Sequence, residues 1–271
     1  MALHIVVHAR RFVFGGASGL LAFASYKSQS DPVHIFWDLD HTILCSISPI
    51  PDNQDSEGNS DIPKQNNNSS KCPVAPSNLV SLLLPPPPKL HHFDQIDDDF
   101  PYDDKTLAPN TRTYFRPGAL LALKLCNMFG TIHVYTAAQE TYTNNILNEL
   151  KNSYYRIVFQ EVLHRDQFPL IVSEGKDLNV VGDRYNLHRS ILFDDRTSNF
   201  RPQNYENGIA VVPFAPERVQ KILDGSWIVY LEELMEMSRL VSIAFWSSTH
   251  LSGDVRRVVA WVRRGWKDST E

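Results

Sequence analysis

The feature that most constrains the fold of this chain is a series of short apolar runs separated by helical patterns. Four runs have the length and composition of buried strands, at residues 33–37, 131–135, 190–193 and 208–212. Helical patterns cover residues 117–128, with Pro117 in the first turn, and residues 140–150. Because strands that alternate with helices form βαβ units, we predict an α/β fold with a mostly parallel central sheet flanked by helices.

Residues 49–109 interrupt this pattern. They contain 11 of the 17 prolines, and their 10 acidic and 4 basic side chains give the segment a charge of −6, against −5 for the whole chain. A segment of this composition buries too little apolar surface to offset the entropy of ordering. We predict a long, largely disordered insertion, which is either a tolerated surface loop or a docking loop with Pro85–Pro88 as a polyproline ligand.

Residues 1–30 contain no acidic residue, and an uncharged stretch at 12–26 follows Arg10 and Arg11. A membrane-spanning helix needs about 20 apolar residues, so this stretch is short for an anchor. The segment is typical of a mitochondrial presequence, and we therefore expect a mitochondrial location. It also fits a secretory signal, which would bring membrane association. A third alternative is a segment with no targeting role in a cytoplasmic or nuclear protein.

After residue 30, we predict a folded domain at residues 31–240, which contains the insertion, and a C-terminal tail at residues 241–271. Within the tail, Asp254–Trp266 has the pattern of a basic amphipathic helix. This helix would either contact a membrane surface or partner, or pack on the sheet with its basic face in solvent, aided by the nearby aromatic residues.

A net charge of −5 and a pI of about 6.1 argue against a nucleic-acid partner. The oligomeric state is not indicated.

Three of the four predicted strands end in side chains that can contact a phosphate or a metal ion. Asp38 and Asp40 follow the first, Thr136 follows the second, and Asp194 and Asp195 follow the third. Ligands bind at the carboxyl ends of strands in an open parallel sheet. Isolated aspartates there can also be helix caps, but three converging groups favour a site.

Clustered carboxylates repel one another, and a hard cation such as Mg²⁺, which binds carboxylates and phosphate oxygens, relieves that repulsion. One aspartate can then attack phosphorus while another protonates the leaving oxygen. Lys176, upstream of the third strand, can balance negative charge.

The segment Asp38-Leu39-Asp40-His41-Thr42 resembles the DxDxT signature of the haloacid dehalogenase (HAD) superfamily. The chain is specifically similar to the phosphatases of the RNA polymerase II C-terminal domain (CTD) and their small relatives. Four further ordered segments carry this resemblance: residues 115–118, 134–142, 175–178 and 192–195. It covers about residues 31–48 and 110–240, and it implies a Rossmann-like HAD fold with a minimal cap.

The resemblance also implies roles for individual residues. Asp38 would be the nucleophile and a Mg²⁺ ligand, and Asp40 the general acid and base, binding the metal through its backbone carbonyl. Thr136 would hold the phosphoryl oxygens, and Lys176 would brace Asp38 and the phosphate. Asp195, with Asp194 beside it, would complete the metal shell. Thr42, Tyr142 and Arg165 are candidate substrate-binding residues, although Tyr142 and Arg165 could instead be packing or surface residues.

These features predict a Mg²⁺-dependent phosphatase that hydrolyses phosphoserine or phosphothreonine in proteins through an aspartyl-phosphate. Residues 151–174 have room for only a small hairpin, and an open site suits a phosphate on a protein chain. The alternative is a non-catalytic presequence-binding module of the mitochondrial inner-membrane import translocase, which is similar in sequence. The retained aspartates favour the enzyme.

Overall fold

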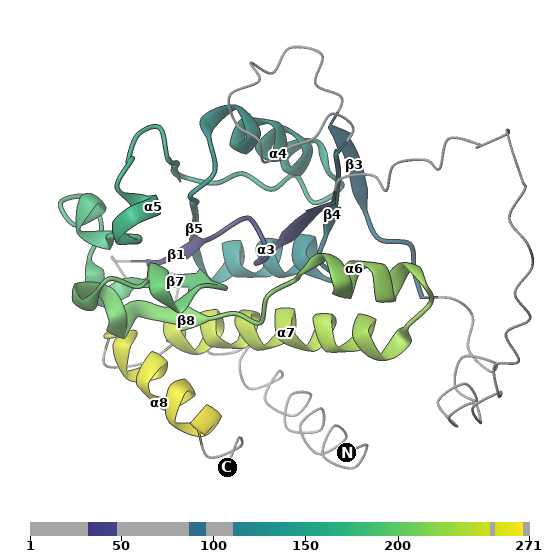
Figure 1. The fold of residues 1–271 in the computed structure, drawn as a ribbon. Coiled ribbons are helices and arrows are strands. Elements are labelled where there is room, and N and C mark those ends of the chain that lie inside the picture. The colour runs from purple at the N-terminus through teal and green to yellow at the C-terminus, as the bar shows by residue number, and fades with distance from the viewer. Residues whose placement is uncertain (1–31, 48–86, 96–110, 250–252, 268–271) are drawn as a thin grey trace, which may run out of the picture.

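The computed structural model describes residues 32–47, 87–95, 111–249 and 253–267, and its centre is a five-stranded parallel sheet (Figure 1). The strand order is β6-β5-β1-β7-β8, and every neighbouring pair is parallel. The strands are β1 (Val33–Trp37), β5 (Gly130–Tyr135), β6 (Val162–Leu163), β7 (Ser190–Asp194) and β8 (Gly208–Ala210). The predicted α/β class and the four predicted strands are confirmed, with β8 ending two residues early.

Helices cover both faces of this sheet (Figure 1). The α-helices are α3 (Ala119–Phe129), α4 (Glu140–Asn152), α5 (Ile171–Glu174), α6 (Pro216–Leu223), α7 (Trp227–Thr249) and α8 (Arg256–Lys267). Short 3₁₀ helices are η2 (Leu178–Val181), η3 (Leu187–Arg189), η4 (Thr197–Asn199) and η5 (Pro202–Asn207). The helices predicted at residues 117–128 and 140–150 correspond to α3 and α4.

Strand β1 shows why the sheet is buried on both sides. Its five residues are all buried, and successive side chains point to opposite faces. Ile35 and Trp37 belong to the larger core cluster, which also contains residues of α3, α4, α7 and α8, whereas Phe36 packs with residues of α5 and η2. A continuous apolar run is the signature of such a two-sided central strand.

A second sheet, which the sequence analysis did not predict, has three antiparallel strands. Its order is β2-β4-β3, with β2 (Leu44–Ile47), β3 (His92–Gln95) and β4 (Thr111–Phe115). Strand β3 lies inside the predicted disordered insertion, so that prediction is wrong for residues 87–95. Cross-strand hydrogen bonds to β4 order a segment whose composition alone favours disorder. Residues 48–86 and 96–110, with Pro85, lie outside the described residues.

The region between Thr136 and Lys176 also differs from expectation. Instead of a hairpin, it contains β6, which extends the parallel sheet beyond β5, and the one-turn helix α5. Backbone hydrogen bonds at both ends of the short pairing, from Val134 to Glu161 and from Thr136 to Leu163, hold β6 at the sheet edge. No cap domain is inserted here, and residues 137–175 are all described.

The predicted boundary between domain and tail is wrong, because α7 runs without a break through residues 240 and 241. The amphipathic helix predicted near the C-terminus is α8, and its Val258 and Val259 are buried in the main core, together with Val255 just before the helix. Trp246 and Trp261 are exposed. Among the described residues, no helix is long and apolar enough to cross a membrane. The predicted targeting segment at 1–30 lies outside the described residues.

Candidate active site

The parallel strand order brings the predicted phosphate- and metal-binding groups to one edge of the sheet. Strand β1 lies between β5 and β7, so Asp38, Thr136 and Asp194 stand at the carboxyl ends of three adjacent strands. The Asp38 amide continues the β-ladder by donating to the Phe193 carbonyl at 2.9 Å. The predicted convergence of strand ends is therefore confirmed by the topology.

Lys176 joins two of these carboxylates. Its Nζ lies 2.8 Å from Asp38 Oδ1 and 2.6 Å from Asp194 Oδ2, and its side chain is wholly buried. Burial lowers the pKa of Lys176, but the two adjacent carboxylates outweigh burial and leave it raised. Burial raises the pKa of Asp38 to about 7, opposed by Lys176 and reinforced by Asp194. One cation thus only partly compensates the negative charge gathered here.

Asp194 is saturated with hydrogen bonds. Its Oδ1 accepts from the Arg196 amide at 2.8 Å and from Asn199 Nδ2 at 2.9 Å, while its Oδ2 accepts from Lys176 and, at 3.0 Å, from Asn199. A carboxylate oxygen offers about two acceptor sites, so these bonds occupy the side chain and make Asp194 an anchor for Lys176. Asn199, which lies five residues after Asp194, was not predicted as a site residue.

Asp195 is only half-buried, and it completes a group of carboxylates suited to a metal ion. Oxygens of Asp38, Asp194 and Asp195 all lie within 4.8 Å of one another. Burial and the charge of Asp194 raise the pKa of Asp195. Because Asp38 and Asp195 resist ionisation without a further cation, their oxygens fit a hard divalent metal, while Asp194 stays bonded to Lys176. We name Asp38, Asp194, Asp195 and Lys176 the strand-end cluster.

Asp40 is held by a tyrosine from α4. The Tyr142 hydroxyl donates to Asp40 Oδ1 at 2.5 Å and also contacts Ser46 Oγ at 3.1 Å. Burial raises the pKa of Asp40, and the Tyr142 hydrogen bond opposes that rise. A carboxyl group that is partly buried and favours protonation can act as a general acid. Tyr142, a predicted substrate-binding residue, is itself buried and lies against Asp40.

The two threonines occupy buried positions beside the carboxylates. Thr136 Oγ1 accepts from the Ala138 amide at 3.1 Å, which fixes its side chain on the loop after β5. Thr42 is fully buried, and within the described part of the chain its Oγ1 has no hydrogen-bond partner. The predicted residue Arg165 lies on the turn after β6, where its amide donates to the Ala138 carbonyl at 3.0 Å.

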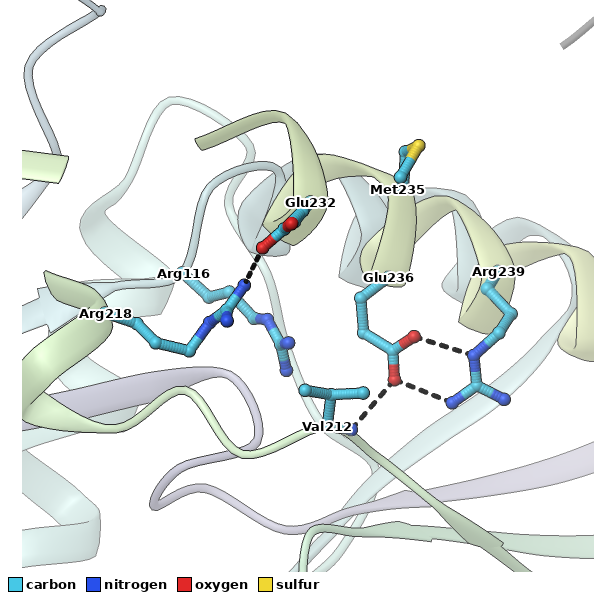
Figure 2. Close-up of a pocket in the computed structure, with 7 residues that line it drawn as sticks. All are labelled: Arg116, Val212, Arg218, Glu232, Met235, Glu236 and Arg239. Carbon is cyan, nitrogen blue, oxygen red and sulfur yellow. Dashed lines mark hydrogen bonds and ion pairs between the residues drawn. The ribbon is translucent and has the colours of Figure 1, made fainter. Parts of the chain in front are cut away.

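Arg116 supports the turn that carries Asp40 and Thr42. Its Nη1 donates to the Thr42 carbonyl at 3.1 Å, and its Nε donates to Glu233 of α7 at 2.6 Å. The guanidinium also lines a pocket of about 360 Å³ between α6 and α7, with Arg218, Arg239 and Glu236 around it (Figure 2). Arg116 is thus a buried structural residue, and no residue of the strand-end cluster lines this pocket.

Comparison with known families identifies the chain. The profile of the "NLI interacting factor-like phosphatase" family matches residues 88–249, which is more than half of the sequence. The chain belongs to this family. The match confirms the resemblance to CTD phosphatases and assigns the chain to the HAD-type phosphatases, which are metal-dependent hydrolases. Asp38 and Asp40 precede the matched residues, and the parallel pairing of β1 joins them to the rest of the domain.

Among solved structures, the chain is similar to "Fcp1, an essential RNA polymerase II CTD phosphatase", with 16% identity and a TM-score of 0.40 over 82% of this chain and 55% of that one. It is also similar to a variant of the fission yeast CTD phosphatase Fcp1 bound to beryllium fluoride, with 15% identity and a TM-score of 0.41 over 93% and 67%. The chain thus spans about half the length of the first. No curated protein matches, and none of these comparisons supports the presequence-binding alternative.

Proposed function

We propose that this phosphatase is Mg²⁺-dependent and hydrolyses phosphoserine or phosphothreonine in protein chains, with Asp38 as its nucleophile. The observation that carries the proposal is the 2.8 Å ion pair between Asp38 and the buried Lys176 at the end of the central strand. Lys176 is anchored by Asp194 and holds the Asp38 carboxylate in one orientation. Positioning and charge compensation supply most of the catalysis of phosphoryl transfer.

In the first step, a carboxylate oxygen of Asp38 attacks phosphorus and the bond from phosphorus to the substrate oxygen breaks. Asp40 donates its proton to that leaving oxygen, which produces the free hydroxyl side chain. In the second step, water attacks phosphorus while Asp40 takes back a proton, and the bond from phosphorus to Asp38 breaks to release inorganic phosphate.

The other residues act on the phosphoryl group and on the general acid. Thr136 lies at the end of β5 next to Asp38, where its hydroxyl can donate to a phosphoryl oxygen. Tyr142 keeps Asp40 in place between the two steps. Asp38 and Asp195 would hold Mg²⁺ with the Asp40 backbone carbonyl, and the bound ion would neutralise phosphoryl charge.

The proposal of a protein substrate rests on the access of a protein chain to the carboxyl ends of the strands. Residues 137–175 contribute an edge strand and a one-turn helix instead of a cap domain, so within the described part of the chain no inserted domain encloses a small molecule at this edge. A phosphorylated side chain on an extended protein segment can reach an open strand edge. The open edge also implies that activity on small aryl phosphates will be measurable.

The test is hydrolysis of p-nitrophenyl phosphate by the full chain, with Mg²⁺ and with EDTA. Asp38→Asn should lower turnover by at least about a hundredfold, whereas the matched control Asp183→Asn, at an exposed position, should retain it. Turnover by Asp38→Asn equal to that of the wild type would refute the nucleophile. A phosphoserine peptide should have a higher kcat/KM than free phosphoserine, and the reverse order would refute a protein substrate.

A further inference from the structure

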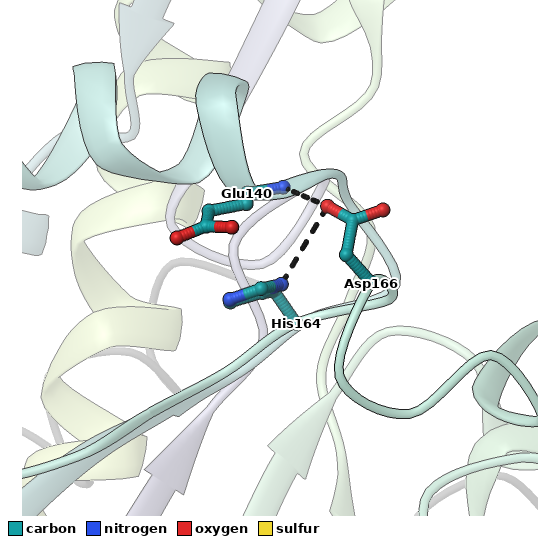
Figure 3. A group of neighbouring side chains, drawn as sticks. All are labelled: Glu140, His164 and Asp166. Atoms are coloured by element: carbon teal, nitrogen blue, oxygen red, sulfur yellow. Dashed lines mark hydrogen bonds and ion pairs between the residues drawn. The ribbon is translucent and has the colours of Figure 1, made fainter.

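A second group of metal-ligating side chains lies outside the strand-end cluster. It consists of Glu140, the first residue of α4, with His164 and Asp166 from the turn after β6. One donor atom from each lies within 4.8 Å of the other two. Figure 3 shows the Glu140 carboxylate beside the imidazole ring of His164, with Asp166 across from them. We name these three residues the His164 cluster.

His164 has an unsatisfied nitrogen that faces this cluster. Its side chain is only 5% exposed, and within the described part of the chain the buried Nδ1 makes no hydrogen bond. Nδ1 lies 3.6 Å from Asp166 Oδ2, which is too far for a hydrogen bond. Buried ring nitrogens are normally paired, so this atom points to a ligand that the polypeptide does not supply.

Asp166 is already oriented toward such a ligand. Its Oδ2 accepts the Glu140 amide at 2.6 Å, which fixes the carboxylate against the first turn of α4. An oxygen of a carboxylate has a further lone pair when it accepts one amide, so Oδ2 can still bind a cation. The Asp166 side chain is 50% exposed, so an ion can arrive from solvent.

The chemistry of the donors selects the ion. One imidazole nitrogen and two carboxylates form a mixed set of the kind that binds Zn²⁺, whereas Mg²⁺ favours oxygen ligands alone. Zinc bonds to nitrogen and oxygen ligands are about 2.1 Å long, which places two ligands of a tetrahedral ion about 3.4 Å apart. The 3.6 Å separation of His164 and Asp166 is close to that spacing.

We propose that Glu140, His164 and Asp166 form a Zn²⁺ site, with water as the fourth ligand. The ion would tie the first turn of α4, which carries Tyr142, to the turn after β6. That turn already pairs with the Thr136 loop, because the Thr136 amide donates to the Leu163 carbonyl at 2.9 Å and the Arg165 amide donates to the Ala138 carbonyl. The zinc would therefore stabilise the loop that bears Thr136, at a position distinct from the strand-end cluster.

The test is calorimetric titration of Zn²⁺ into the full-length protein in saturating Mg²⁺, with Glu140→Gln, Asp166→Asn and Glu149→Gln beside the wild type. Gln and Asn remove the carboxylate charge but keep the shape, and the side-chain amide of Asp166→Asn keeps an oxygen for the Glu140 amide. Glu149 is an exposed glutamate on the same helix and provides the matched control. Far-UV circular dichroism without zinc verifies that each variant is folded.

We expect Glu140→Gln and Asp166→Asn to weaken the zinc Kd by at least about tenfold each, and Glu149→Gln to leave it unchanged. Zinc X-ray absorption of the wild type should show one imidazole ligand. Equal affinity in all four proteins, or no zinc binding by the wild type, would overturn the proposal. The strand-end cluster is identical in all four, and the readout is binding, so the result is independent of whether the phosphatase proposal holds.

Discussion

The Tyr142 hydroxyl donates a 2.5 Å hydrogen bond to Asp40 Oδ1, although the two residues are 102 positions apart in the sequence. The same hydroxyl contacts Ser46, whose Oγ lies 2.8 Å from Thr113 Oγ1. This chain of hydroxyl groups links α4 to the second sheet and ends at the proposed general acid. Tyr142 is therefore a positioning residue for Asp40.

Removing this hydroxyl should impair catalysis without preventing binding. A hydrogen bond to a charged group contributes about 1.5–3 kcal/mol, so Tyr142→Phe should lower kcat about 10- to 150-fold. KM should change less, because the bond acts on Asp40. The measurement is steady-state hydrolysis of p-nitrophenyl phosphate. Tyr154→Phe, at a position that is 94% exposed, is the control, and a wild-type kcat in Tyr142→Phe would exclude this role.

Replacing the buried lysine should destabilise the fold. Lys176→Met leaves Asp38 and Asp194 adjacent with no cation between them, and breaking a buried ion pair in this way costs about 3–5 kcal/mol. Urea unfolding at neutral pH measures the loss, and the exposed Lys151→Met should change stability by less than about 0.5 kcal/mol. The double variant Lys176→Met/Asp194→Asn should recover part of the loss. A stable single variant would contradict the buried triad.

Gly175 precedes Lys176 in a backbone conformation that favours glycine, with φ of +84°. A Cβ there would lie 2.8 Å from the Asn199 carbonyl oxygen, whereas at Gly225, with φ of +92°, nothing lies within 4 Å. Gly225→Ala should therefore cost only about 1 kcal/mol for backbone strain, and Gly175→Ala should cost at least about 1 kcal/mol more. Unfolding midpoints in urea measure both, and equal losses would show that the Asn199 contact is unimportant.

His133 makes stability depend on pH. Burial, followed by the nearby His34 at 3.2 Å, lowers the pKa of His133 to about 3. Below pH 6.5 the unfolded chain binds a proton that the folded chain excludes, so stability is full above pH 6.5 and falls as the pH drops toward 3.

Urea unfolding of the wild type and of His133→Gln, which cannot titrate, measures this effect. Between about pH 7 and pH 5 the wild type should lose about 2 kcal/mol more than the variant. The two pH dependences should be parallel above about pH 7, where the imidazole is neutral in both states. Parallel curves down to about pH 5 would show that His133 protonates in the folded protein.

Local sequence patterns were sufficient to predict a residue's position in the fold where that position depends on its neighbours in the chain. The apolar run at 33–37 and its abrupt end in Asp38 indicate a two-sided central strand with a carboxylate at its end, and β1 has both properties. The same logic located Thr136 and Asp194. The meeting of these groups at one edge follows because parallel βαβ units place the strand ends on the same side of the sheet.

Patterns failed where long-range pairing decides the structure. His92–Gln95 has a polar composition within a proline-rich region, yet it forms β3 because β4 supplies its hydrogen-bond partners. The apolar segment Val162–Leu163 is too short to be predicted as a strand from sequence. It forms a strand because it pairs with the edge of β5. A boundary at residue 240 was inferred where motifs end, but α7 continues because its buried face still packs on the core.

The sequence by itself determined the parallel α/β class and the strand-end aspartates, because each is visible in residues that are adjacent along the chain, and the family resemblance indicated Lys176. Only the tertiary structure decided that Tyr142 binds Asp40, that Asn199 anchors Asp194 and that His164 faces Glu140 and Asp166. These pairs join elements that the sequence separates by up to 102 positions, and their distances depend on how helices and turns pack on the sheet. Residue type and spacing carry no information on such packing, since one side chain suits several environments until the fold selects its neighbours.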